Sequence, residues 1–265
     1  MSYPNIIYGS FGDEKVTAAS AIGGAPLGAL MVLPDGRKFR HAKASATAVV
    51  AGNLYQQNAY SVISGSADAD VLTEGAISSG GVAGSATVII TAGGTATIPV
   101  NSLAGGYFFV SSGTAAGECY KIKTNTAGAK SGTCTLTLWE NDKFKTTLAA
   151  GSSLYGIRQS EYDNVTLTTS DTVSVGSLAG VAPVAASASY YFWVQRAGPA
   201  ATYTLGTVIV GEPVCVAGTA GGVMQIPPAA ADTTGLRIVK QMVAIGDVLN
   251  ASAATKYSLI NLRLE

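Results

Sequence analysis

Charged residues are scarce in this chain. They make up 12% of its 265 residues, about half of the ~25% usual for soluble domains, and the 16 basic and 16 acidic side chains cancel to a net charge of zero. Nucleic-acid binding needs a basic field, and binding of basic partners needs an acidic one. Neither class of partner is therefore expected.

A surface with so little charge gives copies of the chain little electrostatic repulsion. We therefore expect much of the surface to be covered in the working state, by further copies of the chain or by a partner. The alternative is a monomer whose surface is built from Ser, Thr and Gly.

Histidine and cysteine are also rare, with one His and three Cys. His41 is the single possible base for a Ser-His-Asp triad, and it lies among Arg and Lys residues with no acid beside it. Metal sites built on several imidazoles are excluded by number. Cys119, Cys134 and Cys215 are too few and too scattered for a disulfide framework or a zinc site. Cys119 and Cys134 flank a predicted hairpin and could face each other, but the favoured interpretation is that the cysteines are small buried apolar residues.

No carboxylate pattern or phosphate loop indicates an enzyme. Asp68, Asp70 and Glu74 lack the spacing of a calcium-binding EF-hand. Five acids fall in the region expected to be β, and no spacing selects a pair among them for glycoside cleavage: Glu118, Glu140, Glu161, Asp163 and Asp171. Neither Gly-x-x-x-x-Gly-Lys-Ser/Thr nor Gly-x-Gly-x-x-Gly between strand and helix occurs. We expect no catalytic residue, no metal and no cofactor.

Long hydrophobic runs are missing as well. The mean hydropathy of +0.32 would suit a membrane protein, but no apolar run approaches the ~20 residues of a spanning helix. Ala, Gly and Thr raise the value. Residues 1–10 have no basic residue and no apolar core, so they do not read as a signal peptide and synthesis in the cytosol is expected.

What the chain does have is short apolar runs separated by turns rich in its 32 glycines. This pattern predicts a mainly β protein of antiparallel sandwich or barrel modules. It also predicts an extended N-terminal arm, a β-hairpin and at most one short helix, placed at 45–63 although Gly52 interrupts it. Three regions are expected: an arm, hairpin and linker region at 1–85, a β-sandwich-like region at 86–188, and a small β-barrel module at 189–265.

The N-terminal region holds two candidate contact elements. An arm over 1–20 is rich enough in apolar residues to pack on a neighbour, or equally on its own domain. A hairpin is predicted over 27–44, because Pro34 presets φ at its turn and Gly36 suits the position with positive φ. Its second strand places Arg37, Phe39 and His41 on one face and Lys38 and Arg40 on the other, which forms the most basic patch of the chain. That patch could be a solvated face or a contact for an acidic protein surface.

An aromatic strand follows near residue 190. Tyr190, Phe192 and Val194 share one face, and Tyr191, Trp193 and Gln195 share the other. Large apolar groups on both faces predict a strand buried on both sides, either central in a sheet or at an interface. The runs at 107–109 and 190–193 have almost no Lys or Arg beside them in sequence, so a basic groove for stacked nucleobases is not expected.

The C-terminal block resembles the decoration, or cement, proteins of tailed-phage capsids. The resemblance rests on the aromatic strand 191–195, Val-Gly-Glu-Pro-Val at 210–214, Gly-Thr-Ala-Gly-Gly-Val at 218–223, Ile-Gly-Asp-Val-Leu at 245–249 and the closing strand 257–264. The segments 26–28 and 31–37 also look like the start of larger cement proteins. The similarity covers about the last third of the chain and this hairpin, and it carries no catalytic motif.

The resemblance implies a β-barrel module, often trimeric, seated on the capsid surface. We therefore expect a structural virion protein, made in the host cytoplasm, that binds the major capsid protein as a homo-oligomer with a trimer favoured, and that binds neither nucleic acid nor membrane. The rival functions are a tail-fibre or receptor-binding module for carbohydrate and a hydrolase with two carboxylates. The candidate interface residues are Tyr3, Ile6, Ile7, Tyr8, Phe11, Arg37, Arg40, Tyr190, Tyr191 and Trp193.

Overall fold

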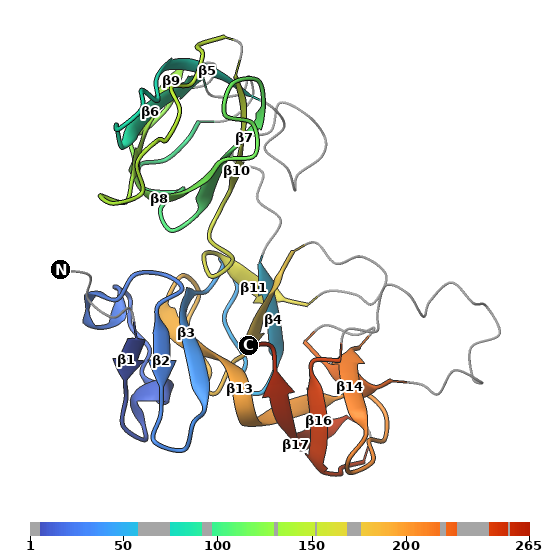
Figure 1. The fold of residues 1–265 in the computed structure, drawn as a ribbon. Coiled ribbons are helices and arrows are strands. Elements are labelled where there is room, and N and C mark those ends of the chain that lie inside the picture. The colour runs from blue at the N-terminus through green and yellow to red at the C-terminus, as the bar shows by residue number, and fades with distance from the viewer. Residues whose placement is uncertain are drawn as a thin grey trace. The chain divides into compact units, whose positions relative to one another are not determined.

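The protein is mainly β and folds into two units, seen here in a computed structural model (Figure 1). The structure describes residues 6–57, 75–91, 97–129, 132–151, 153–168, 176–217, 221–226, 244–253 and 255–265. One unit comprises Met1–Asn58 and Glu161–Glu265, and the other comprises Ala59–Ser160. Among the expectations from sequence, Tyr3, Asp171 and the acids of the loop at 68–74 lie outside the described residues.

The first unit is built on a sheet of eleven strands. They are β1 (Ile6–Tyr8), β2 (Leu30–Val32), β3 (Lys38–Lys43), β4 (Leu54–Gln57), β11 (Val165–Leu167), β12 (Leu178–Val181), β13 (Tyr191–Thr204), β14 (Pro213–Val216), β15 (Val223–Gln225), β16 (Gly246–Asn250) and β17 (Lys256–Arg263). The main path runs β1-β2-β3-β13-β15-β14-β16-β17, and β17 pairs back onto β13, which closes a ring of strands within the C-terminal block. The long strand β13 joins this ring to the hairpin β2–β3 (Figure 1).

The second unit is a closed barrel of six strands with the order β10-β5-β6-β9-β8-β7. The strands are β5 (Gly75–Gly80), β6 (Thr87–Thr91), β7 (Tyr107–Ser112), β8 (Cys119–Asn125), β9 (Thr133–Leu138) and β10 (Leu154–Arg158). Their apolar residues alternate with polar ones, so one face of every strand points into a single core. Closure leaves the barrel without an edge strand.

The hairpin predicted around Pro34-Asp35-Gly36 is confirmed. Gly36 has a φ of 84°, Leu33 N–H donates to the Arg37 carbonyl at 3.0 Å, and Val32 lies opposite Lys38 in the antiparallel pair β2–β3. Local turn chemistry was sufficient to locate it.

The helix predicted at 45–63 is wrong over its described part. Val49 forms a bridge with Ala186, β4 follows at Leu54–Gln57, and Gly52 has a φ of 75° that no α-helix allows. The only helical segments among the described residues are two short 3-10 turns, Asp13–Lys15 and Ile22–Gly24.

The two units do not coincide with the three consecutive regions expected at 1–85, 86–188 and 189–265. Strands from the two ends of the sequence pair with each other, since β3 lies beside β13 and β4 lies beside β11 and β12. The barrel is therefore inserted into a unit whose sheet draws on both flanking segments. Sequence order does not reveal such pairing, because it depends on contacts between residues more than a hundred positions apart.

Candidate interaction surfaces

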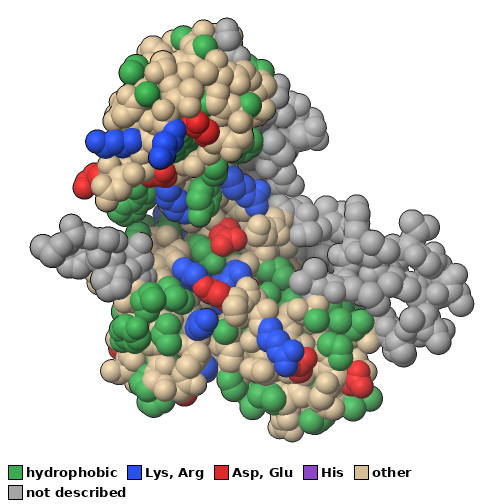
Figure 2. All heavy atoms as spheres, in the orientation of Figure 1, with side chains coloured by type: hydrophobic (Ala, Val, Ile, Leu, Met, Phe, Trp, Pro, Cys, Tyr) green, Lys and Arg blue, Asp and Glu red, His purple; other side chains and the backbone are tan. Residues whose placement is uncertain are grey.

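The N-terminal arm forms the edge of the large sheet. Its strand β1 pairs in parallel with β2, with Ile7 opposite Met31, and among the described strands it has no partner on its other side. All three of its side chains are exposed, Ile6 and Ile7 by 39% and Tyr8 by 82%, and Phe11 beyond it is exposed by 65%. Figure 2 shows hydrophobic side chains gathered at this β1–β2 edge.

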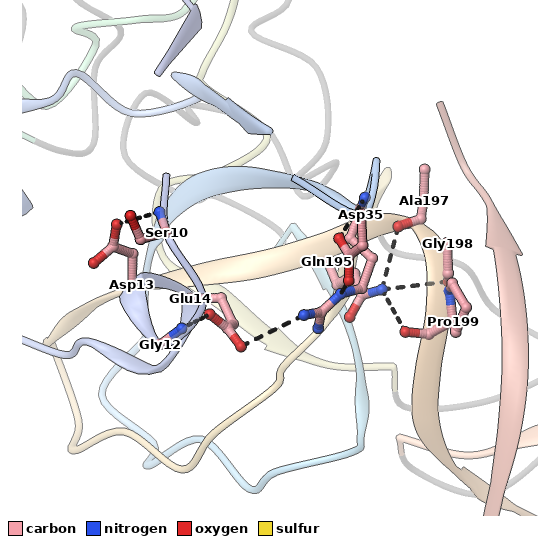
Figure 3. Close-up of polar contacts among 10 residues, drawn as sticks. Ser10, Gly12, Asp13, Glu14, Asp35, Gln195, Ala197, Gly198 and Pro199 are labelled. Carbon is pink, nitrogen blue, oxygen red and sulfur yellow. Dashed lines mark hydrogen bonds and ion pairs between the residues drawn. The ribbon is translucent and has the colours of Figure 1, made fainter. Parts of the chain in front are cut away.

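The arm is also fastened to its own unit, which is one of the two packing alternatives left open by the sequence. Gly9 N–H donates to the Val32 carbonyl at 3.0 Å, and Ala18 bridges to Tyr191. Between these points Glu14 is only 4% exposed and lies 3.7 Å from the Arg37 guanidinium. Figure 3 shows Glu14 pointing from the arm toward the hairpin turn at Asp35.

Two cations of the basic patch predicted on the hairpin, Arg37 and Arg40, pair with acids of the same unit. The Arg37 Nε lies 2.7 Å from a carboxylate oxygen of Asp35, in addition to its contact with Glu14. Arg40 forms a close ion pair with Glu265 and donates to the Gly28 carbonyl at 2.9 Å. These pairs compensate the charges of Arg37 and Arg40, and the partners Glu14 and Glu265 come from segments distant in sequence.

The aromatic strand is central, as its two apolar faces predicted. Within β13, Phe192 and Val194 pack into one buried cluster while Trp193 packs into another with Phe39. Trp193 is only 3% exposed, which makes it part of the core of this unit and removes it from the exposed candidate anchors. Tyr190 and Tyr191 remain partly exposed.

His41 lies on β3, directly opposite Trp193 of this strand, and is fully buried. Its ring stacks on Tyr191 with centroids 5.4 Å apart and lies 5.0 Å from the Trp193 ring. The Ile22 N–H donates to Nε2 at 3.4 Å, and Nδ1 lies 3.3 Å from the Pro26 carbonyl. Burial lowers the pKa of His41 below its usual value, so the neutral ring serves as a structural acceptor.

Gln195 controls the bend at which β13 changes partners. The strand pairs with β3 as far as Ala197 and with β17 from Ala197 onward, and its register against β3 slips between Gln195 and Ala197. The buried side-chain amide donates to the carbonyls of Ala197, Gly198 and Pro199 at 3.2, 3.3 and 2.8 Å (Figure 3). It therefore supplies a buried donor to the backbone carbonyls that follow the register slip.

A second exposed apolar surface, which the sequence reasoning missed, covers the outer face of the C-terminal ring of strands. Tyr257 and Leu259 on β17 are exposed by 52% and 40%, and Leu249 on β16 by 43%. Tyr203 of β13 lies opposite Tyr257, and their ring centroids are 5.7 Å apart. The signal was present in the alternation of the closing strand, where apolar residues occupy both faces.

The described side chains show no metal centre and no membrane-crossing helix. Within these ranges no three His, Cys, Asp or Glu side chains come together as a metal ion would require. Nor does any described helix have the length and apolar character needed to cross a membrane.

Comparison with known proteins gives no relative. No protein-family model, no curated protein and no solved structure matches this chain. The exposed β1 edge and the outer face of the C-terminal ring are therefore the features from which a function is argued.

Proposed function

We propose that this chain is a structural protein of the virion, which binds the outer surface of a tailed-phage capsid and cements neighbouring copies of the major capsid protein. It acts as a homo-oligomer, most simply a trimer, and it catalyses no reaction. The observation that carries the proposal is the edge strand β1, where three consecutive side chains are exposed and apolar beside an edge that no other described strand covers. The resemblance of the C-terminal block to cement proteins selects a capsid as the partner.

An open strand edge supports binding by strand addition. A partner strand laid along β1 would pair with its free N–H and C=O groups, and it would cover side chains such as Tyr8 at the same time. Natural proteins usually protect such edges with charge, proline or a covering element. Here the side chains of the edge strand carry no charge.

Cementing needs only a modest free energy at each contact. A standard contact buries about 1,600 Å², and repetition of the contact over a symmetric shell makes the total much larger than any single site. The near-absence of net charge removes a repulsive term that would oppose dense packing of copies.

The test is co-sedimentation of the purified chain with capsids that lack it. We expect saturable binding with a fixed number of copies per capsid and a higher melting temperature of the decorated shell. A tail-spike-like protein of the same size is the control for non-specific trapping. Failure to sediment with the capsid, or a monomer by mass measurement at micromolar concentration, would count against the proposal.

A further inference from the structure

The outer wall of the six-stranded barrel carries aromatic rings beside charged side chains. Tyr107 on β7 lies directly opposite Lys121 on β8, and the Lys121 ammonium is 3.9 Å from the centre of the Tyr107 ring. On its other side, Tyr107 lies opposite Arg158 of β10. The sequence has almost no Lys or Arg beside this aromatic run, because both cations are brought to it by strand pairing.

A second ring continues the same wall. Trp139 follows the end of β9, and its backbone N–H donates to the Lys121 carbonyl at 3.2 Å. The Lys123 ammonium lies 5.9 Å from the Trp139 ring centre and 2.7 Å from the Glu140 carboxylate. A cation placed over the face of an aromatic ring is attracted to the ring by about 0.5–1 kcal/mol at exposed sites, so these contacts help to hold both rings in place.

These rings remain open to solvent. Tyr107 is exposed by 46% and Trp139 by 43%, while the neighbouring Phe108 and Leu138 point into the core. Two residues along β7, Phe109 lies opposite Gly156 of β10, which makes room for its ring, since a side-chain carbon at Gly156 would come within 2.2 Å of the ring. The wall therefore presents rings that are already ordered, which lowers the entropic cost of binding a ligand.

Hydroxyl groups border the rings. The outward positions of β9 are Thr133, Thr135 and Thr137, in alternation with buried Cys134, Leu136 and Leu138. Thr137 lies opposite Thr87 on β6 and Thr124 on β8. Figure 2 shows side chains of both charges and hydrophobic ones on the barrel near β8.

We propose that this wall, defined by Tyr107, Lys121, Lys123, Trp139 and Glu140, binds a neutral polysaccharide. The apolar face of a sugar ring stacks on an exposed aromatic ring, and its hydroxyl groups both donate and accept hydrogen bonds. The ammonium groups of the wall donate, the Glu140 carboxylate accepts, and the Thr hydroxyls do both. The barrel thus has a binding role separate from the capsid contacts of the other unit.

Charge selects this ligand over a nucleic acid. The wall carries three cations, Lys121, Lys123 and Arg158. It also carries two carboxylates: Glu140 pairs with Lys123, and Asp142 accepts from the backbone N–H of Lys121 at 2.6 Å. A single-stranded nucleic acid needs a groove of uncompensated cations along its phosphates. The exposed Glu140 side chain, 82% accessible, would repel those phosphates.

The test is affinity electrophoresis of the full chain in native gels that contain laminarin, dextran or galactomannan as neutral polysaccharides. We expect retardation in at least one of these gels, and a loss of affinity of tenfold or more in each of Tyr107→Ala and Trp139→Ala. Val100→Ala is the matched control, because Val100 is an exposed apolar residue of the same unit, 64% accessible, outside the wall. Thermal melting of every variant shows whether the fold is retained.

Tryptophan fluorescence gives a second measurement that does not depend on migration. The chain has two tryptophans, and because Trp193 is buried, a bound sugar should change the emission of Trp139 alone, an effect that Trp139→Phe removes. The dissociation constant for the polysaccharide should change less than twofold between 50 and 300 mM salt. The proposal is overturned if no neutral polysaccharide binds, if both alanine variants bind normally, or if only alginate or a dT oligonucleotide binds with a steep loss of affinity in salt.

Discussion

Replacing Tyr8 by Ser tests the role of the β1 edge at a single side chain. Tyr8 is 82% exposed, so the substitution removes almost no contact within the chain, and the free energy of unfolding should change by less than about 0.5 kcal/mol. Complete burial of a side chain of this size stabilises by about 1.5–3 kcal/mol. A partner that covers the exposed part would thus gain about 1–2.5 kcal/mol from it, so the variant should bind about 5- to 70-fold more weakly.

The assay is titration of capsids with the variant, followed by sedimentation, alongside thermal melting of the free protein. Val82→Ser is the matched control, because Val82 is also exposed, by 56%, but lies in the barrel. A dissociation constant within twofold of the unaltered protein, at unchanged melting temperature, would show that the exposed face of β1 is not the contact. Deleting the whole arm is a poorer test, since it also removes the sheet pairing of β1 and the buried Glu14.

Three further predictions concern the stability of the first unit. Gln195→Leu should lower the free energy of unfolding by about 1–3 kcal/mol in urea, because three carbonyls lose a buried donor; a loss below about 0.5 kcal/mol would contradict the role given to this amide. The pKa of His41 is lower in the folded state than the unfolded value of about 6.5, so the folded state binds fewer protons and stability should fall as the pH drops below that value. Urea titrations at pH 7.5 and 5.5 should show this loss, and His41→Phe should reduce it; an equal loss in the variant would assign it to other groups. Gly246→Ala should lower the free energy of unfolding by about 1–3 kcal/mol, because the new carbon would lie 2.3 Å from the Asn261 carbonyl oxygen on the paired strand. Gly211→Ala is the comparison: nothing lies within 4 Å of the new carbon, so this variant meets only the backbone strain of a φ of 86°.

Much of the β character could be predicted because its signals are local. The turn at Pro34-Asp35-Gly36 and the alternating residues of β8 and β9 depend on neighbours within a few positions. The two-sided burial of β13 also followed from apolar residues on both of its faces. The helix expected at 45–63 does not form over its described part. The segment is Ala-rich and only weakly periodic, and its strand β4 pairs with β11 and β12 instead.

The candidate surfaces were predicted less well, for a reason visible in particular side chains. Arg37 and Arg40 were judged from the charges beside them in sequence, but their partners include Glu14 and Glu265, which other segments supply. Tyr107 was judged to lack cations for the same reason, although Lys121 lies directly across the strand pair.

The sequence by itself determined that this protein is a mainly β chain with a formal net charge of zero, one histidine, three cysteines and an arm rich in apolar residues. These properties follow from composition and from residues close together along the chain. Only the tertiary structure decided which strands are neighbours, and hence that the barrel interrupts the large sheet, that Trp193 is core, and that aromatic rings meet lysines on the barrel wall. Strand neighbours are chosen by packing over long sequence separations, and no local pattern encodes that choice.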